Sequence, residues 1–315
     1  MAAQYGSYPW QPTGNYQWML SDVIEVIESY RQYWPLTQRS WLYRLMSQKK
    51  WQKSWEAHDP DVVTKRENAG KPLNKTSGGG LNLILDRGRR AGLIPWEAVQ
   101  SKRGSHIEPY RMRSADDFAT NLQEMLGGMT VDRQMNQERR VIVCCETDGM
   151  VPILESVCLE YGVDLISGQG FSTIGAKRDM ATAIGSGDSI ILHLADHDHS
   201  GREIERALQG DISAWVTELG GKVEVKNIAL TDKQIDEYEL YWEAAKDTGS
   251  NHGLGSGITR EAQLEAFPPR DLLSLLRDSI EAHLDMDAYR EARILESQWK
   301  GEITDVLTES ISGRF

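Results

Sequence analysis

The sequence has few cysteines and no long apolar run. Its three cysteines, Cys144, Cys145 and Cys158, are too few for the disulfide framework of a small secreted protein. No CxxC or Cys/His spacing typical of a zinc site occurs. No stretch of about 18 apolar residues is present, and the first residues are not a basic stretch followed by an apolar one. We therefore expect a soluble, cytoplasmic or otherwise intracellular protein with no membrane partner.

Positive charge is also scarce, because 35 Lys and Arg stand against 47 Asp and Glu, for a net charge of -12. Such a balance at first argues against a nucleic-acid partner, since phosphate binding draws on Lys and Arg. The charge is unevenly distributed, however, because residues 31–113 hold 17 Lys and Arg but only 7 Asp and Glu. This asymmetry favours a basic DNA-binding module joined to an acidic one, with an ordinary solvated surface as the alternative.

The length of the chain predicts two domains. At 315 residues with 40% hydrophobic content, it exceeds the usual size of one domain, about 100 to 200 residues. We divide it into an N-terminal arm at 1–20, a first domain at 21–113, a connector at 114–139 and a second domain at 140–315.

The first domain has the pattern of a DNA-binding helix-turn-helix. Helical spacing of apolar residues predicts a helix from Ser21, a second over 38–48 and a basic third over 81–91. Helix, turn and basic helix is the layout of such a reader, and residues 95–110 could supply a wing. The candidate DNA-binding residues are Lys71, Lys75, Arg87, Arg89 and Arg90.

In the second domain, apolar runs alternate with helical segments. The expected strands cover residues 140–146, 163–167, 189–195 and 223–230. Helices are expected at 152–161 and 201–219, a loop at 246–259, and a largely helical end at 268–310. Strands that alternate with helices predict an α/β fold whose mostly parallel sheet is flanked by helices.

Acidic residues stand where two expected strands end. Glu146 ends the first strand, and Asp196 and Asp198 follow the third. Because ligands of open α/β sheets bind beyond the carboxyl ends of the strands, these carboxylates are expected to converge. Oxygen ligands there suit Mg²⁺, although a lone DxD is more often a surface or capping feature. His197 and His199 flank the acids, but alternate residues at a strand end point in opposite directions.

These segments carry a family resemblance. The stretches RVIVCCETDGM, GVDLISGQGFST and SIILHLADHDHSGREI resemble a Toprim domain, the metal-binding fold of topoisomerases, bacterial-type primases and certain nucleases. NIALTDKQIDEYEL and EAQLEAFPPRDLL are similar to segments beyond the Toprim core in topoisomerase VI A subunits, meiotic double-strand-break proteins and their short standalone relatives. PLTQRSWLYRLM resembles the motif in which this family places an arginine four residues before its DNA-attacking tyrosine. The resemblance spans roughly residues 30–290.

The resemblance implies a winged-helix domain followed by a Toprim domain. Tyr43 would be the nucleophile, with Arg39 beside it, and Mg²⁺ would lie on Glu146, Asp196 and Asp198. Such a nucleoid-associated protein would cleave and religate double-stranded DNA as a type IIB topoisomerase, through a tyrosine-DNA phosphodiester. It would form a homodimer in which the tyrosine of one protomer meets the acids of the other. Since no GxxxxGK[ST] loop is present, any ATP hydrolysis would need a separate B-type subunit.

Two alternatives stay open, because the chain departs from the family at Leu42, often an aromatic residue, and at Thr147, often a lysine. In a Toprim metal-dependent nuclease or primase-like protein, metal-activated water or a nucleotide hydroxyl would attack. Tyr43 would then be structural, as a tyrosine on an amphipathic helix usually is. In a catalytically inactive DNA-binding protein, affinity would fall with salt and no strand would break.

Overall fold

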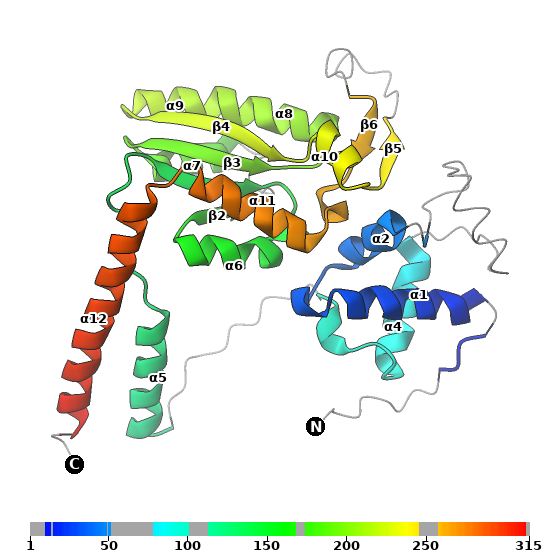
Figure 1. Ribbon diagram of the computed structural model, residues 1–315, viewed down its shortest axis with the longest axis horizontal. Helices are drawn as coiled ribbons and strands as arrows, with labels where there is room; N and C mark the ends of the chain where they lie inside the picture. The colour runs from blue at the N-terminus through cyan, green and yellow to red at the C-terminus, as the bar shows by residue number, and fades with distance from the viewer. Residues whose placement is uncertain are drawn as a thin grey trace.

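The computed structural model of the chain is an α/β structure built around a parallel sheet (Figure 1). It describes residues 10–13, 15–48, 50–51, 78–100, 113–167, 174–245 and 258–312. The sheet consists of β1 (Arg140–Cys145), β2 (Asp164–Ser167), β3 (Asp188–Leu194) and β4 (Lys222–Ala229), in the order β2-β1-β3-β4. All three pairings are parallel, so the predicted sheet and its strands are confirmed.

Helices cover both faces of this sheet, which explains why 141–145 of β1 and 190–192 of β3 are continuous apolar, buried runs. The helices α6 (Val151–Tyr161) and α11 (Pro269–Glu281) lie on one face (Figure 1). The other face is covered by α7 (Ile174–Ile184), α8 (His199–Ala207) and α9 (Ser213–Glu218). Alternate strand residues enter the two cores: Val143 and Leu192 the first, Ile142 and Ile191 the second.

Two helical predictions for this domain need correction. The expected single helix at 201–219 is divided, because a π-helical stretch at 208–212 separates α8 from α9. The helix α7 was not predicted, since its sequence IGAKRDMATAI has only a weak apolar stripe. The predicted helices at 152–161 and 268–310 are confirmed, the second as α11 followed by α12 (Met286–Ser312).

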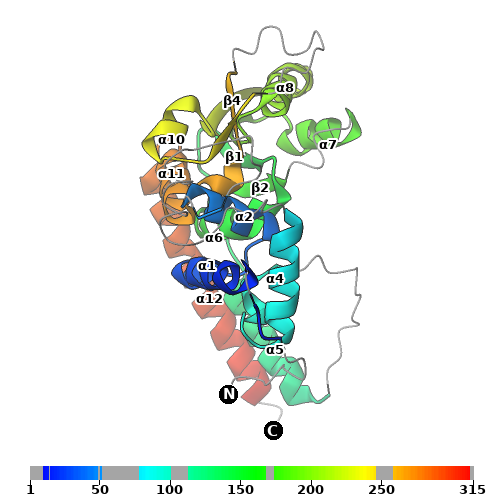
Figure 2. The same ribbon diagram turned by 90° about the vertical axis from the view of Figure 1, so that its right-hand side faces the viewer.

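The N-terminal module consists of α1 (Asn15–Ser29), α2 (Gln38–Ser47) and α4 (Gly78–Arg90) (Figures 1 and 2). The prediction that the first helix begins at Ser21 is wrong, because Met19 and Leu20 continue its apolar face and are buried in the core. The start of α2 is confirmed, since the Thr37 side chain accepts a hydrogen bond from the Ser40 N–H.

The expected wing is only partly covered by the description. Residues 96–98 form a short 3₁₀ helix, and Val99 forms a β-bridge with Leu36. Residues 101–110 of the wing, like Lys71 and Lys75, lie outside the described residues. The α/β character and the parallel sheet are therefore established, whereas the winged helix stays a prediction.

A short antiparallel pair extends the sheet domain toward the acids. It consists of β5 (Trp242–Ala244) and β6 (Arg260–Ala262), preceded by α10 (Asp232–Glu237). The backbone of Ala262 also pairs with His197, which stands between Asp196 and Asp198. The 3₁₀ turn η6 (Leu264–Ala266) follows β6 and leads the chain past the acids into α11.

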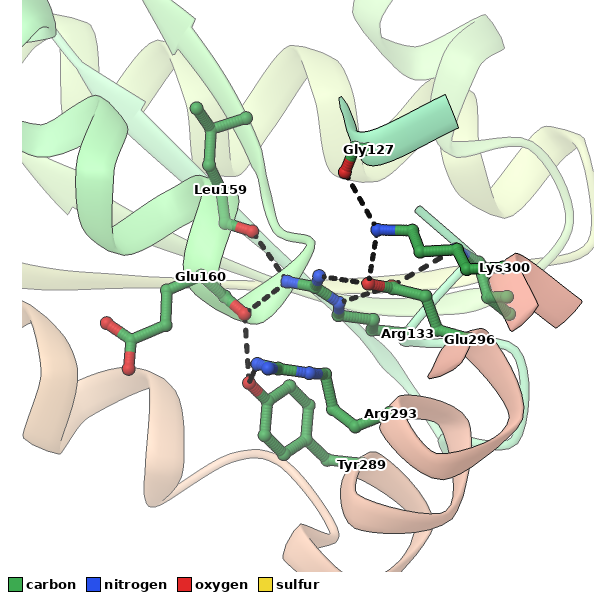
Figure 3. A network of polar contacts seen from close by, with 9 residues as sticks. Gly127, Arg133, Leu159, Glu160, Tyr289, Arg293, Glu296 and Lys300 are labelled. Carbon is green, nitrogen blue, oxygen red and sulfur yellow. Dashed lines mark hydrogen bonds and ion pairs between the residues drawn. The ribbon is translucent and has the colours of Figure 1, made fainter. Parts of the chain in front are cut away.

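The helices α5 (Ala115–Gly128) and α12 run side by side and extend away from the sheet (Figures 1 and 2). A buried ion pair between Arg133 and Glu296 fixes the base of this pair (Figure 3). Arg133 also donates to the Leu159 carbonyl at the end of α6, and Lys300 joins Glu296 to the Gly127 carbonyl. In the described ranges, no helix is both long and apolar enough to cross a membrane.

Candidate functional site

The three predicted acids lie at the carboxyl edge of neighbouring strands. Glu146 directly follows β1, and its N–H donates to the Leu194 carbonyl at the end of β3 at 2.9 Å. Asp196 and Asp198 follow β3, where a tight approach holds the chain: a Cβ added at Gly201 would lie 2.3 Å from the Asp196 carbonyl oxygen. Only glycine fits there, so α8 begins directly behind the acids.

Each aspartate has one oxygen engaged by the backbone. Asp196 Oδ1 accepts from the Leu264 N–H at 2.8 Å, and Asp198 Oδ1 accepts from the Gly201 N–H at 2.8 Å, which caps α8. Glu146 Oε2 is buried, and no described residue donates a hydrogen bond to it. A buried carboxylate oxygen without a donor is costly unless a cation or a proton compensates it.

Two of these acids, Glu146 and Asp196, have raised pKa values. Burial raises the pKa of Glu146 to about 7, and the negative charges of Asp196 and Asp198 add to the shift. Burial likewise raises the pKa of Asp196 to about 6, with Asp198 contributing. These carboxylates therefore repel one another at neutral pH, which is the condition that a bound cation relieves.

The donor set fits a partly hydrated hard cation. In the part of the chain that the structure describes, no three His, Cys, Asp or Glu side chains are gathered as a ready-made metal cage. Mg²⁺ does not require such a cage, since it usually keeps several waters and takes one or two carboxylates together with phosphate oxygens. Glu146 with its unpaired oxygen, and the remaining oxygens of Asp196 and Asp198, could serve in this way.

We expect Glu146→Gln to stabilise the protein in EDTA. Because the folded-state pKa of Glu146 is about 7, the folded state holds a proton that the unfolded state releases near 4.5. Stability is thus lost as pH rises from 4.5 through 7, and removing the charge should restore about 1–3 kcal/mol at pH 8. Urea unfolding at pH 8 and pH 5 measures this, with exposed Glu155→Gln as control. Equal stability of wild type and Glu146→Gln at pH 8 would contradict it.

The helix α2 brings Arg39 to the acids of its own chain. Arg39 Nε lies 3.0 Å from Glu265 Oε2, and Arg39 Nη2 lies 4.0 Å from Asp196 Oδ2. The same guanidinium donates to Gln263 and lies over the ring of Tyr43, 5.8 Å from its centre. One cation therefore contacts the candidate nucleophile and two carboxylates at once.

Tyr43 itself is nearly enclosed, with 5% of its surface exposed. Burial raises its pKa, whereas the charge and hydrogen bond of Arg39 act in the opposite direction. A second tyrosine, Tyr241, packs beside it with 6.5 Å between ring centres. The phenol of Tyr43 is therefore protonated at neutral pH, with Arg39 as the group that can stabilise its anion.

Two residues of this site were not predicted. Glu265 is 2% exposed and lies in the family-like segment EAQLEAFPPRDLL, where it was assigned no role; Tyr241 is partly buried and directly follows the family-like segment NIALTDKQIDEYEL. Only the path of the chain from β6 through η6 brings Glu265 to Arg39. The flanking His197 has a structural role, because its ring lies near the Leu230 carbonyl and 3.5 Å from Asp232.

The predicted DNA-binding arginines that are described, Arg87, Arg89 and Arg90, occupy the last turn of α4. Arg89 lies over the ring of Trp96 at 4.3 Å and donates to its carbonyl at 3.3 Å. Arg90 forms an exposed ion pair with Asp86 at 3.1 Å. Such an exposed pair contributes little to stability, so Arg90 can exchange Asp86 for a phosphate at small cost.

Comparison with known proteins gave no match: no family model, no curated protein and no solved structure is similar to this chain.

Proposed function

We propose that this chain is a magnesium-dependent DNA strand-breaking protein that acts like the A subunit of topoisomerase VI. The observation that carries the proposal is the position of Arg39, over the ring of Tyr43 and in contact with Asp196 and Glu265. A phenol, a guanidinium and a cluster of acids at the edge of a parallel sheet are the groups that transesterification of a phosphodiester requires. The resemblance to the Toprim family supports the same assignment.

The chemical step exchanges one phosphodiester for another. The Tyr43 oxygen attacks the DNA phosphorus and loses its proton to water or a nearby carboxylate. The bond from phosphorus to the 3′ oxygen breaks, that oxygen takes up a proton, and the 5′ phosphate stays attached to Tyr43. Arg39 stabilises the phenolate as it forms, and the reverse step rejoins the strand without an external energy source.

The acids would hold the metal. Glu146, Asp196 and Asp198 fit Mg²⁺ by their oxygen donors, by the raised pKa values of Glu146 and Asp196, and by the unpaired Glu146 oxygen. Bound there, Mg²⁺ would supply positive charge against the phosphate and the leaving oxygen.

DNA would be held mainly through its backbone. Phosphates would be contacted by Arg87 and Arg90 in the last turn of α4 and by Lys71 and Lys75, which precede α4 in the sequence. Arg89, which stacks on Trp96, would also contact a phosphate. Phosphate contacts fix position rather than sequence. A homodimer and an ATP-hydrolysing B-type subunit remain predictions from the resemblance.

One observation favours a second candidate, a Toprim nuclease. Because Tyr43 is only 5% exposed and its pKa is raised, the phenol must become accessible before it can attack. If it never does, metal-activated water is the nucleophile and Tyr43 only packs the helix.

Cleavage of supercoiled plasmid in Mg²⁺, quenched with detergent and run with and without protease, tests the proposal. We expect nicked or linear DNA with protein on its 5′ ends, and a loss of about 1,000-fold or more in Tyr43→Phe and Asp196→Asn. Tyr241→Phe is the matched control, because its ring packs beside Tyr43. Free ends that persist in Tyr43→Phe would instead identify a nuclease. Salt-sensitive binding without any break would identify an inactive DNA-binding protein.

A further inference from the structure

Glu265 is a buried carboxylate at the contact between the N-terminal module and the sheet domain. It lies in the turn η6, against α2, and 2% of its surface is exposed. Its Oε2 lies 3.0 Å from Arg39 Nε, and its carboxylate also forms a hydrogen bond with the Thr37 side chain at the start of α2. Both contacts reach the helix that carries Tyr43.

The turn that holds Glu265 is fixed on either side. The preceding residue, Leu264, donates its N–H to Asp196 Oδ1 at 2.8 Å. The following residue, Ala266, accepts a hydrogen bond at 2.8 Å from Nη1 of Arg44, which is 1% exposed and stands next to Tyr43 in α2. The backbone around Glu265 is therefore tied to a candidate metal ligand on one side and to the helix of the nucleophile on the other.

The loop after Glu146 also packs against Glu265 and the start of α2. A Cβ added at Gly149 would lie 2.8 Å from Thr37 Cγ2 and 3.0 Å from Glu265 Oε1. The backbone of this loop therefore packs directly on the Thr37–Glu265 contact, and any larger residue would separate α2 from the sheet edge. The segment after β1 thus packs on this carboxylate, and the segment after β3 holds the backbone of the neighbouring residue Leu264.

Apart from its contact with Glu265, the Arg39 side chain has few constraints. Its side chain is 54% exposed, and its contact with Asp196 is long, at 4.0 Å. Its short contacts are with Gln263 and with Glu265, both in the segment from β6 to η6. Of the two, only Glu265 is ionisable and enclosed, so it contributes most to the direction of the guanidinium.

We propose that Glu265 is a positioning residue of the strand-breaking site, which holds Arg39 over Tyr43 and beside Asp196. This inference rests on the proposed function and assigns Glu265 no direct contact with DNA. Without the Glu265 charge, Arg39 swings into solvent and Tyr43 loses the cation that stabilises its anion. DNA affinity is unaffected, since no contact to the substrate is removed.

The test is a double-mutant cycle on the rate of covalent complex formation, with Glu265→Gln, Arg39→Gln and the double variant. We expect each single variant to slow the reaction about 10- to 100-fold, and the double variant to be no slower than Arg39→Gln alone. Binding of duplex DNA by Glu265→Gln should stay near wild type, and rates are compared below the melting temperature of each variant. Losses that multiply, or a Glu265→Gln variant that reacts like wild type, would overturn the inference.

A second variant decides the matter if Glu265→Gln does not fold. Gln263→Met removes the other hydrogen bond to Arg39 and leaves the buried carboxylate in place. A rate near wild type, or only a few-fold lower, supports Glu265 as the residue that positions Arg39. A loss as large as that of Arg39→Gln assigns the positioning to Gln263 and contradicts the inference. If the wild-type protein forms no covalent complex, both the proposed function and the inference are contradicted. If the wild type forms the covalent complex and Glu265→Gln forms it at the same rate, only the inference is contradicted.

Discussion

Arg133→Met is expected to lower the free energy of unfolding by about 2–4 kcal/mol, because it leaves the buried Glu296 carboxylate with only Lys300 and the Val131 N–H as partners. Both side chains are at most 9% exposed, and Arg133 Nη2 lies 3.0 Å from Glu296 Oε1 (Figure 3). Arg133 also donates to the Leu159 carbonyl at the end of α6. The variant therefore loses the link among α12, the connector and the sheet domain.

The pH dependence of this effect follows from Glu296. Burial alone would raise its pKa, but the hydrogen bonds from Arg133 and Lys300 lower it to about 2. A carboxyl with a lowered folded-state pKa stabilises the protein above its unfolded value, and this stabilisation is lost as pH falls from about 4.5 to 2. The difference between wild type and Arg133→Met should therefore be largest at neutral pH and smaller at pH 3.5.

Urea unfolding at pH 7 and pH 3.5 measures both effects. Arg290→Met, which removes an exposed ion pair with Asp287 from the same helix, should change stability by less than about 1 kcal/mol. Arg133→Met combined with Glu296→Leu should recover much of the loss, because no buried charge is left unpaired. A loss of under 1 kcal/mol in Arg133→Met would mean that water reaches Glu296 and that the pair is not buried in solution.

The sheet could be predicted because each strand can be recognised from its own short stretch of sequence. The segments around Val141 and Ile191 are continuous apolar runs, as strands covered on both faces must be, and the acids stand directly after them. Chain order then sufficed to bring Glu146, Asp196 and Asp198 to one edge, since β1 and β3 are parallel neighbours. No side-chain detail was required for that conclusion.

Glu265 could not be predicted in this way. In the sequence QLEAFPP it reads as an ordinary surface glutamate, and it is buried only because α2 packs against η6 from more than 200 positions away. Tyr241 is similar, since its position beside Tyr43 depends on how the residue before β5 meets the end of α2. Residues defined by contacts between distant segments carry no local signal. For the same reason the sequence suggested Tyr43 as a nucleophile but not its degree of burial.

The site is expected to work within one chain, so that combining two inactive variants restores no cleavage. The resemblance implies instead that Tyr43 of one protomer meets the acids of the other. In the structure, however, Arg39 of α2 contacts Asp196 and Glu265 of the same chain. The apolar core is also continuous from Tyr43 and Leu45 of α2 to the residues of the sheet domain. Exchange of α2 between protomers would have to break these contacts within each chain before the same contacts could form between chains.

Co-expression of Tyr43→Phe and Asp196→Asn with two different tags, followed by purification on both, isolates mixed dimers for the plasmid assay. If the site forms between protomers, each mixed dimer has one complete site, made from Tyr43 of one chain and Asp196 of the other, and nicks DNA. If the site forms within a chain, neither chain is complete, and no nick appears. Mixed dimers of wild type with Tyr43→Phe are the positive control, since they nick DNA under either arrangement.

A mixture that nicks DNA would mean that α2 leaves its own sheet domain when two copies bind DNA. An inactive mixture beside an active control supports one complete site per chain. Co-purification that yields no mixed dimer supports the same conclusion only where the wild type cleaves DNA as a monomer, because a monomer has no second chain to supply Tyr43. In that case two strands are cut only when two complete chains meet on the duplex, and the double-strand break rate should rise with the square of protein concentration while nicking rises in proportion to it.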